Sequence, residues 1–209
     1  MRTISKQKGL TLIEVLLGMA LGVAALTAVT SLVGYGIGVN ANLIASSRVN
    51  EETSNVLSLM VRDIRRAGYS GDTLDMLSDP AANPSPFADS ITISALAGEA
   101  ANSCILFSYD ANNNGVLDGG ANGENFGYRL RENTVEIRQG VATCEENGWL
   151  TLTDPDVVSI DALTFVMGQT IENGIPTTTI TLNMQAELVT NDDVSRQFTT
   201  EILVRNYDG

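Results

Sequence analysis

The first forty residues contain an almost unbroken apolar run from Val15 to Val39. The run is about 25 residues long, and a helix of that length exceeds the ~30 Å hydrocarbon thickness of a bilayer. Its polar residues come before the run, whereas a secretory signal peptide has a shorter apolar core and a cleavage site beyond it. The pattern therefore predicts a membrane-length helix that a cut at Gly9 would leave in place.

Beyond Val39 the periodicity predicts that the helix continues. Apolar residues recur at steps of three and four between residues 49 and 67, and charged residues fall mostly on other faces. Arg65 and Arg66 suit a C-terminal turn, and Gly68 is placed to end the helix. A helix from Leu10 to Gly68 would be roughly 88 Å long. Its second half would present an amphipathic stripe to a sheet.

A linker at 72–87 contains three of the chain's prolines. After it, apolar and polar residues alternate along the chain. The segment 128–137 is predicted to form a hairpin that turns at Glu132-Asn133, and Asn191–Asp193 is predicted as the turn of the last hairpin. Alternation typical of half-buried strands also covers 91–94, 163–167, 180–188 and 198–204, and 104–109 is predicted to be a short apolar strand. We therefore expect an α+β fold, with the long helix packed on one antiparallel β-sheet head.

Charge is distributed unevenly along the chain, which has 12 basic and 25 acidic residues. Arg2, Lys6 and Lys8 precede the apolar run, so the positive-inside rule leaves the N-terminus cytoplasmic and sends the rest outward. No lysine remains after Lys8. Because so acidic a surface repels phosphates, a nucleic-acid partner is not expected.

The segment from Lys8 to Glu14, with Gly9-Leu10-Thr11-Leu12-Ile13-Glu14, resembles the type IV prepilin signal G-[FL]-T-L-I-E. The resemblance implies cleavage between Gly9 and Leu10 and N-methylation of Leu10. It also implies an ion pair between Glu14 and the Leu10 amine of a neighbouring subunit. A charge within a bilayer costs roughly 2.5–3.5 kcal/mol, so it is rarely there without a partner. The alternative is that Glu14 is solvated in the headgroup layer.

The segment Arg62–Tyr69, which reads R-D-I-R-R-A-G-Y, resembles the sequence that closes the long helix in PilW-like minor pilins. The J-type pseudopilins of type II secretion have a looser version, and a plain helix face with a C-cap would also explain each residue. The resemblance implies a pilin-like organisation: a leader at 1–9, a membrane or filament-core helix at 10–39, its amphipathic continuation at 40–70, and a β-rich head at 71–209.

Cys104 and Cys144 fall in the part that is expected outside the cytoplasm. An even cysteine count in an oxidising compartment predicts one disulfide, and closing a loop of about 40 residues stabilises by roughly 3–4 kcal/mol. Two buried free thiols are the alternative. A zinc site is poorly supported, because the chain has no histidine to complete a tetrahedral set.

The segment Asp110–Asp118 begins with the D-x-N-x-N-G order of a calcium loop, in which oxygen ligands alternate and a glycine allows the sharp turn. The position of the usual bidentate glutamate is Ala121, so the EF-hand pattern fails there. The candidate ligands are Asp110, Asn112, Asn114, the Val116 carbonyl, Asp118 and, with a longer loop, Glu124. An Asx-rich surface turn without metal is the alternative.

An enzyme is not expected. Without histidine, Ser-His and Cys-His nucleophile pairs cannot form within the chain. A phosphate-binding GxxxxGK loop is also missing from the sequence.

The resemblance implies a minor pilin that is held in the inner membrane with its head in the periplasm and then inserted at or near the tip of a type IV pilus. There it would help to initiate assembly. The implied partners are other minor and major pilins, the prepilin peptidase and a tip adhesin. The alternatives are a J-type pseudopilin and a calcium-dependent adhesive head on a pilin anchor.

Overall fold

A computed structural model describes residues 9–71, 76, 78, 79, 81–120, 123–140, 143–172 and 175–206. The basic leader residues, part of the 72–87 linker and Ala121 lie outside this set. The chain forms two compact units, Met1–Ile44 and Ala45–Gly209. Each unit is described by itself, and the second one contains the head.

Helix α1 spans Leu12–Ile64 and belongs to both units. The Thr11 carbonyl accepts the first helical hydrogen bonds, from the N–H groups of Glu14 at 3.1 Å and Val15 at 3.2 Å. After Ile64 the backbone tightens to i→i+3 bonds. Gly68 then adopts a left-handed φ of 79°, which confirms it as the residue that stops the helix.

The first sheet has the antiparallel order β1 (Thr92–Ser94), β2 (Cys104–Ser108), β3 (Asn125–Arg131), β4 (Thr134–Gln139) and β5 (Leu150–Thr151). The predicted β3–β4 hairpin is confirmed. Glu132 and Asn133 both have positive φ values, 47° and 62°, as a two-residue type I′ turn requires. This turn pairs Tyr128 with Ile137 and Leu130 with Val135.

The second sheet has three long strands in the order β6 (Val158–Glu172), β7 (Ile175–Leu188) and β8 (Asn191–Val204). The prediction of Asn191–Asp193 as the last turn is wrong, because the turn is two residues earlier and Leu188 pairs with Asn191. The pairing then shifts so that Glu187 lies opposite Ser195. The Asn191 side chain accepts the Asp193 N–H at 3.2 Å, so these turn-forming residues shape a bulge instead.

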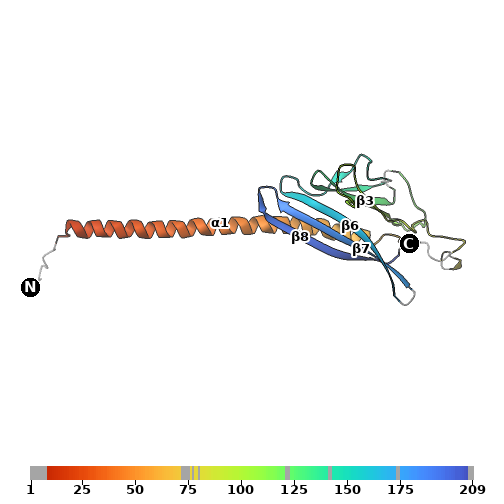
Figure 1. The fold of residues 1–209 in the computed structure, drawn as a ribbon, viewed down its shortest axis with the longest axis horizontal. Helices are drawn as coiled ribbons and strands as arrows, with labels where there is room; N and C mark the ends of the chain where they lie inside the picture. Colours follow the sequence, from red (N-terminus) through yellow and green to blue (C-terminus); the bar gives the residue numbers. More distant parts are fainter. Residues whose placement is uncertain are drawn as a thin grey trace, which may run out of the picture. The chain divides into compact units, whose positions relative to one another are not determined.

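One core joins the head part of α1 to both sheets (Figure 1). The helix contributes the predicted stripe, with Val49, Val56, Met60, Ile64 and Ala67 buried. Aromatic and branched side chains of β2, β3, β6, β7 and β8 complete the core. Loops of the first sheet also bond to β6: the Ile160 N–H donates to the Asn133 carbonyl at 2.8 Å, and the Phe165 N–H donates to the Asn102 carbonyl at 2.9 Å. The predicted α+β class is confirmed, with the strands divided between two sheets.

Candidate functional site

The predicted cleavage and pairing residues lie at the start of α1. Gly9 and Leu10 precede the helix, and the Leu10 side chain is 74% exposed. Glu14 is exposed in the first helical turn, where its carboxylate complements the positive end of the helix dipole. Within the described part of the chain, the Glu14 side chain has no hydrogen bond or ion pair. The ion pair with a neighbouring Leu10 amine therefore stays a prediction.

The first unit exposes its apolar side chains on every face of the helix. By length and composition, α1 could cross a membrane. Its hydroxyl groups at Thr27, Thr30 and Ser31 donate to carbonyls of the preceding helical turn. They are thus satisfied without water, as an apolar surrounding requires. The segment has the properties of a helix that packs among lipids or other apolar helices.

The segment Arg62–Tyr69 fastens the end of α1 to the head. The Tyr128 hydroxyl donates to Asp63 Oδ2 at 2.6 Å. The Arg66 guanidinium carbon lies 4.0 Å from the centre of the Tyr109 ring, a cation–π contact. The Gly68 N–H donates to the carbonyl of Ser108, the last residue of β2, at 2.9 Å. The motif that suggested a pilin therefore fixes the helix to β2 and β3.

Burial has electrostatic consequences at this junction. It raises the pKa of Tyr128 well above its ordinary value, and the adjacent Asp63 carboxylate raises it further. Burial also raises the pKa of Tyr109, although the Arg66 charge opposes this shift. Both phenols therefore keep their protons well above neutral pH.

The loop that begins at Asp110 contacts the chain just after the helix, at Tyr69 and Gly71. Asp110 is buried, and its carboxylate accepts N–H bonds from Gly71 and Gly115, both at 2.8 Å. Burial by itself raises the pKa of Asp110, but four backbone N–H groups outweigh it and the pKa is lowered. A Cβ at Gly71 would lie 2.7 Å from Asn113 Cα, so only glycine fits this approach.

The structure brings most of the predicted calcium ligands into one loop. Glu124 is buried and accepts N–H bonds from Ala111 at 2.7 Å and Asp118 at 3.2 Å. The Asn112 and Asn114 amides both donate to Asp118 Oδ2. The Val116 side chain is exposed. In the described residues no three acidic or cysteine side chains form a metal-binding group. The carboxylates instead organise backbone N–H groups, and calcium binding stays a prediction.

Comparison with known proteins decides the family. Residues 42–204 match the family described as prepilin peptidase-dependent protein B. The chain belongs to the prepilin peptidase-dependent protein B family. Residues 4–30 also match the prokaryotic N-terminal methylation motif, the region where the prepilin signal was recognised. A type IV pilin-like protein is thereby confirmed, while the narrower PilW-like assignment stays a prediction.

One curated relative is prepilin peptidase-dependent protein B of Escherichia coli (strain K12), which is 34% identical over 85 residues. The match covers 40% of this chain and 44% of the relative, less than half of either protein. No solved structure matches the chain.

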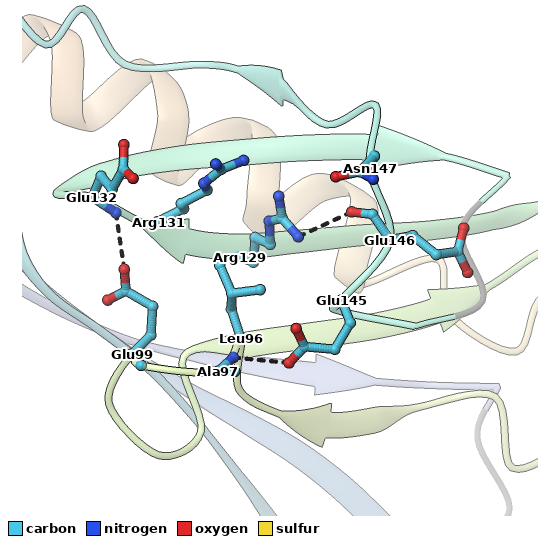
Figure 2. A pocket seen from close by; sticks show the side chains of 10 residues that line it. Leu96, Ala97, Glu99, Arg129, Arg131, Glu132, Glu145, Glu146 and Asn147 are labelled. Carbon is cyan, nitrogen blue, oxygen red and sulfur yellow. Dashed lines mark hydrogen bonds between the residues drawn. The ribbon is translucent and has the colours of Figure 1, made fainter.

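A polar cavity of about 420 Å³ opens beside β3 in this family member (Figure 2). Two of its carboxylates are occupied by backbone N–H groups: Glu99 accepts from Glu132 at 2.9 Å, and Glu145 accepts from Ala97 at 2.8 Å. The cavity is lined by Leu96–Glu99, Arg129, Arg131, Glu132 and Glu145–Asn147. These two carboxylates therefore hold the loops around the cavity in place.

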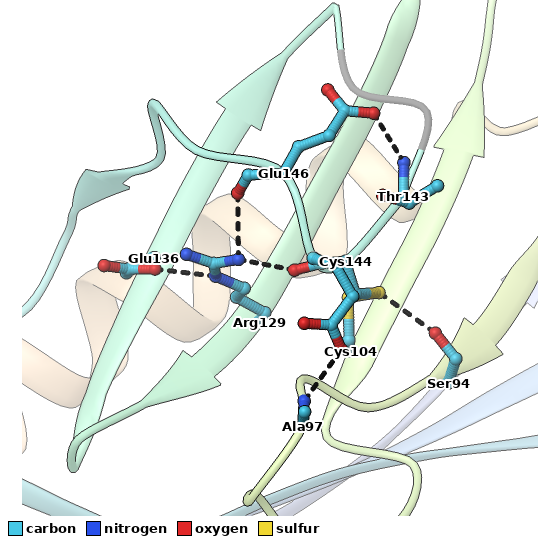
Figure 3. Close-up of a disulfide and its surroundings, with 9 residues drawn as sticks. Ser94, Ala97, Cys104, Arg129, Glu136, Thr143, Cys144 and Glu146 are labelled. Carbon is cyan, nitrogen blue, oxygen red and sulfur yellow. Dashed lines mark hydrogen bonds and ion pairs between the residues drawn. A yellow bond between two sulfur atoms is a disulfide. The ribbon is translucent and has the colours of Figure 1, made fainter.

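The predicted disulfide joins Cys104 of β2 to Cys144, and both cysteines are buried (Figure 3). It holds the 143–149 segment over Arg129, which is only 2% exposed. The Arg129 guanidinium pairs with Glu136 at 2.7 Å, donates to the Cys144 and Glu146 carbonyls, and lies 4.4 Å from the Trp149 ring centre. The disulfide, the aromatic ring and the ion pair thus form one buried cluster outside the main core.

The sequence predicted the disulfide of this cluster but not the contacts of Arg129, although one of these contacts could have been predicted. A two-residue turn at Glu132-Asn133 places Arg129 directly opposite Glu136, so the ion pair followed from the predicted hairpin. The contact between Tyr128 and Asp63 joins residues that are 65 positions apart, so no pattern of neighbouring residues could have predicted it.

Proposed function

We propose that this chain is a minor pilin, processed by the prepilin peptidase and incorporated into a type IV pilus at or near its tip, where it helps to initiate assembly. The observation that carries the proposal is the methylation motif at 4–30 together with a helix whose apolar side chains up to Ile44 are exposed on every face. A helix of this kind needs lipid or other helices around it.

The mechanism is subunit packing. Before assembly the helix would anchor the chain in the inner membrane with its head in the periplasm. After cleavage at Gly9, the methylated Leu10 amine of one subunit and Glu14 of another would set their register. The other minor and major pilins are the proposed neighbours, and a tip adhesin is a further proposed partner.

The test is the intact mass of the chain from cells with and without the prepilin peptidase. We expect a peptidase-dependent loss of residues 1–9 and the gain of one methyl group. An uncut chain, or a cut after residue 39, would refute the proposal.

A J-type pseudopilin would share the leader and the helix, and the Arg62–Tyr69 motif has a looser counterpart there. The mass measurement does not separate the two, so we would follow the mature chain into purified filaments. Its presence in sheared type IV pili supports the minor pilin. Its presence only with the type II secretion apparatus supports the pseudopilin.

A further inference from the structure

The sheet edges of the head differ sharply in how they are protected. The first sheet ends in β1 and β5, which are only three and two residues long. In the second sheet, the first half of β6 bonds to Asn133 and Asn102 of neighbouring loops. Strand β8 is 14 residues long, is the outermost strand in Figure 1, and has backbone bonds only to β7 among the described residues. A row of unpaired N–H and C=O groups can template another strand.

The bend and most of the charges that would protect β8 lie in its first half. The bulge and two aspartates lie within Asn191–Val194. From Ser195 to Val204 the pairing with β7 has no irregularity. Within this stretch, Phe198–Val204 contains no proline, lysine or arginine, and Glu201 is its single charge. Natural edge strands of this length are normally bent, charged or covered.

The helix beside β8 has apolar surface that three strands do not cover fully. The Arg196 guanidinium donates to Ser46, which places β8 on that side of α1. At 100° per residue, Leu57 and Val61 lie on the same side of the helix as Ser46, and both are only partly buried. On the opposite flank, Asp63 and Glu52 bond to Tyr128 and to the Asp154 N–H. A fourth strand beside β8 would complete the cover over Leu57 and Val61.

We propose that the outer edge of β8 at Phe198–Val204 receives an extended strand from a different protein subunit in the filament. The added strand would place apolar side chains toward α1, in line with Phe198, Ile202 and Val204. It would place basic or uncharged polar side chains on the outer face, where Glu201 is exposed. This inference rests on the proposed filament role.

A second copy of this chain fits the edge less well than a different subunit. Antiparallel pairing of two β8 strands would point the head parts of their α1 helices in opposite directions, which does not fit two neighbouring subunits of one filament. In-register parallel pairing would bring the two Glu201 carboxylates together, which is unfavourable.

The test compares the full-length variants Thr199→Pro and Thr200→Pro with Thr199→Ala and Thr200→Ala. Successive N–H groups of an antiparallel strand point to opposite sides. One proline therefore removes a bond to β7, and the other removes only an outward N–H group. Thermal unfolding in detergent micelles identifies the outward variant as the more stable of the two. The alanine variants keep both N–H groups.

We expect the outward proline variant to be cleaved and methylated normally, but to be depleted from purified filaments by roughly threefold to tenfold, as for one lost hydrogen bond. Incorporation equal to that of its alanine control overturns the inference. The wild-type chain could also form a homodimer in micelles that the outward proline variant abolishes. This result would show that the occupant of the edge is a second copy, and it would overturn the inference. Absence of the wild-type chain from filaments refutes the filament role itself.

Discussion

The contact between Tyr128 and Asp63 gives the sharpest test of how the helix is held to the head. In Tyr128→Phe the buried ring stays and only the hydroxyl that donates to Asp63 at 2.6 Å is lost. A hydrogen bond to a charged group contributes about 1.5–3 kcal/mol. Because Asp63 is only partly buried, water can replace the lost donor in part. We therefore expect destabilisation near the lower limit, about 1.5–2 kcal/mol.

The same variant changes the pH dependence of stability in a defined direction. The pKa of Tyr128 is raised in the folded state, so above pH 10 the unfolded chain releases a proton that the folded chain keeps. Stability is then lost as pH rises, by up to about 1.4 kcal/mol per pH unit for each such tyrosine. Tyr109 contributes to this loss in both proteins, whereas Tyr128 contributes only in the wild type.

The assay is urea unfolding of the full chain in detergent micelles, followed by the fluorescence of Trp149, the single tryptophan. Tyr69→Phe is the matched control, because its exposed hydroxyl donates to Asn113 at 3.0 Å and its loss should cost less than about 0.5 kcal/mol. The reasoning is refuted if Tyr128→Phe and the wild type have the same free energy of unfolding and the same change of that free energy with pH between pH 10 and 11. That result would mean that the hydrogen bond between Tyr128 and Asp63 does not hold the helix to the head.

Four further predictions concern the head. Gly71→Ala should destabilise it by about 1–3 kcal/mol, since the new Cβ would overlap Asn113; Gly119→Ala, where the structure leaves open space, should be nearly neutral in the same urea assay. Glu136→Gln leaves the buried Arg129 without its counter-charge and should cost about 3–5 kcal/mol, against less than about 1 kcal/mol for Glu146→Gln at the more exposed pair with Arg138. Reduction of the Cys104–Cys144 disulfide should lower stability by about 3–4 kcal/mol, and a chain equally stable in reductant would contradict this. If the 110–124 loop binds calcium as an extracellular site, calcium at about 100 times its dissociation constant should stabilise the head by about 2.7 kcal/mol; thermal unfolding with Asp118→Asn as control checks this, and an unchanged wild-type midpoint refutes it.

The sequence by itself determined the features that depend on neighbouring residues. The apolar run, the three- and four-residue stripe and Gly68 specified α1, because helix periodicity and capping are local. The Glu132-Asn133 turn specified the β3–β4 register for the same reason. The Gly9–Glu14 motif indicated the prepilin class, which the family match bears out.

Only the tertiary structure decided how the strands divide into two sheets, because strand partners far apart in sequence leave no local pattern. It also moved the last turn from Asn191–Asp193 to residues 189 and 190: pairing along the whole of β7 and β8 outweighed local turn preference, and the asparagine and aspartates formed the bulge. The roles of Asp63, Arg66 and Arg129 depend on side chains that folding brings together from β2, β3 and the disulfide segment. The contacts of Asp63 and Arg66 attach the helix motif at 62–69 to the head. They form only when residues far apart in the sequence pack together, so no local pattern predicts them.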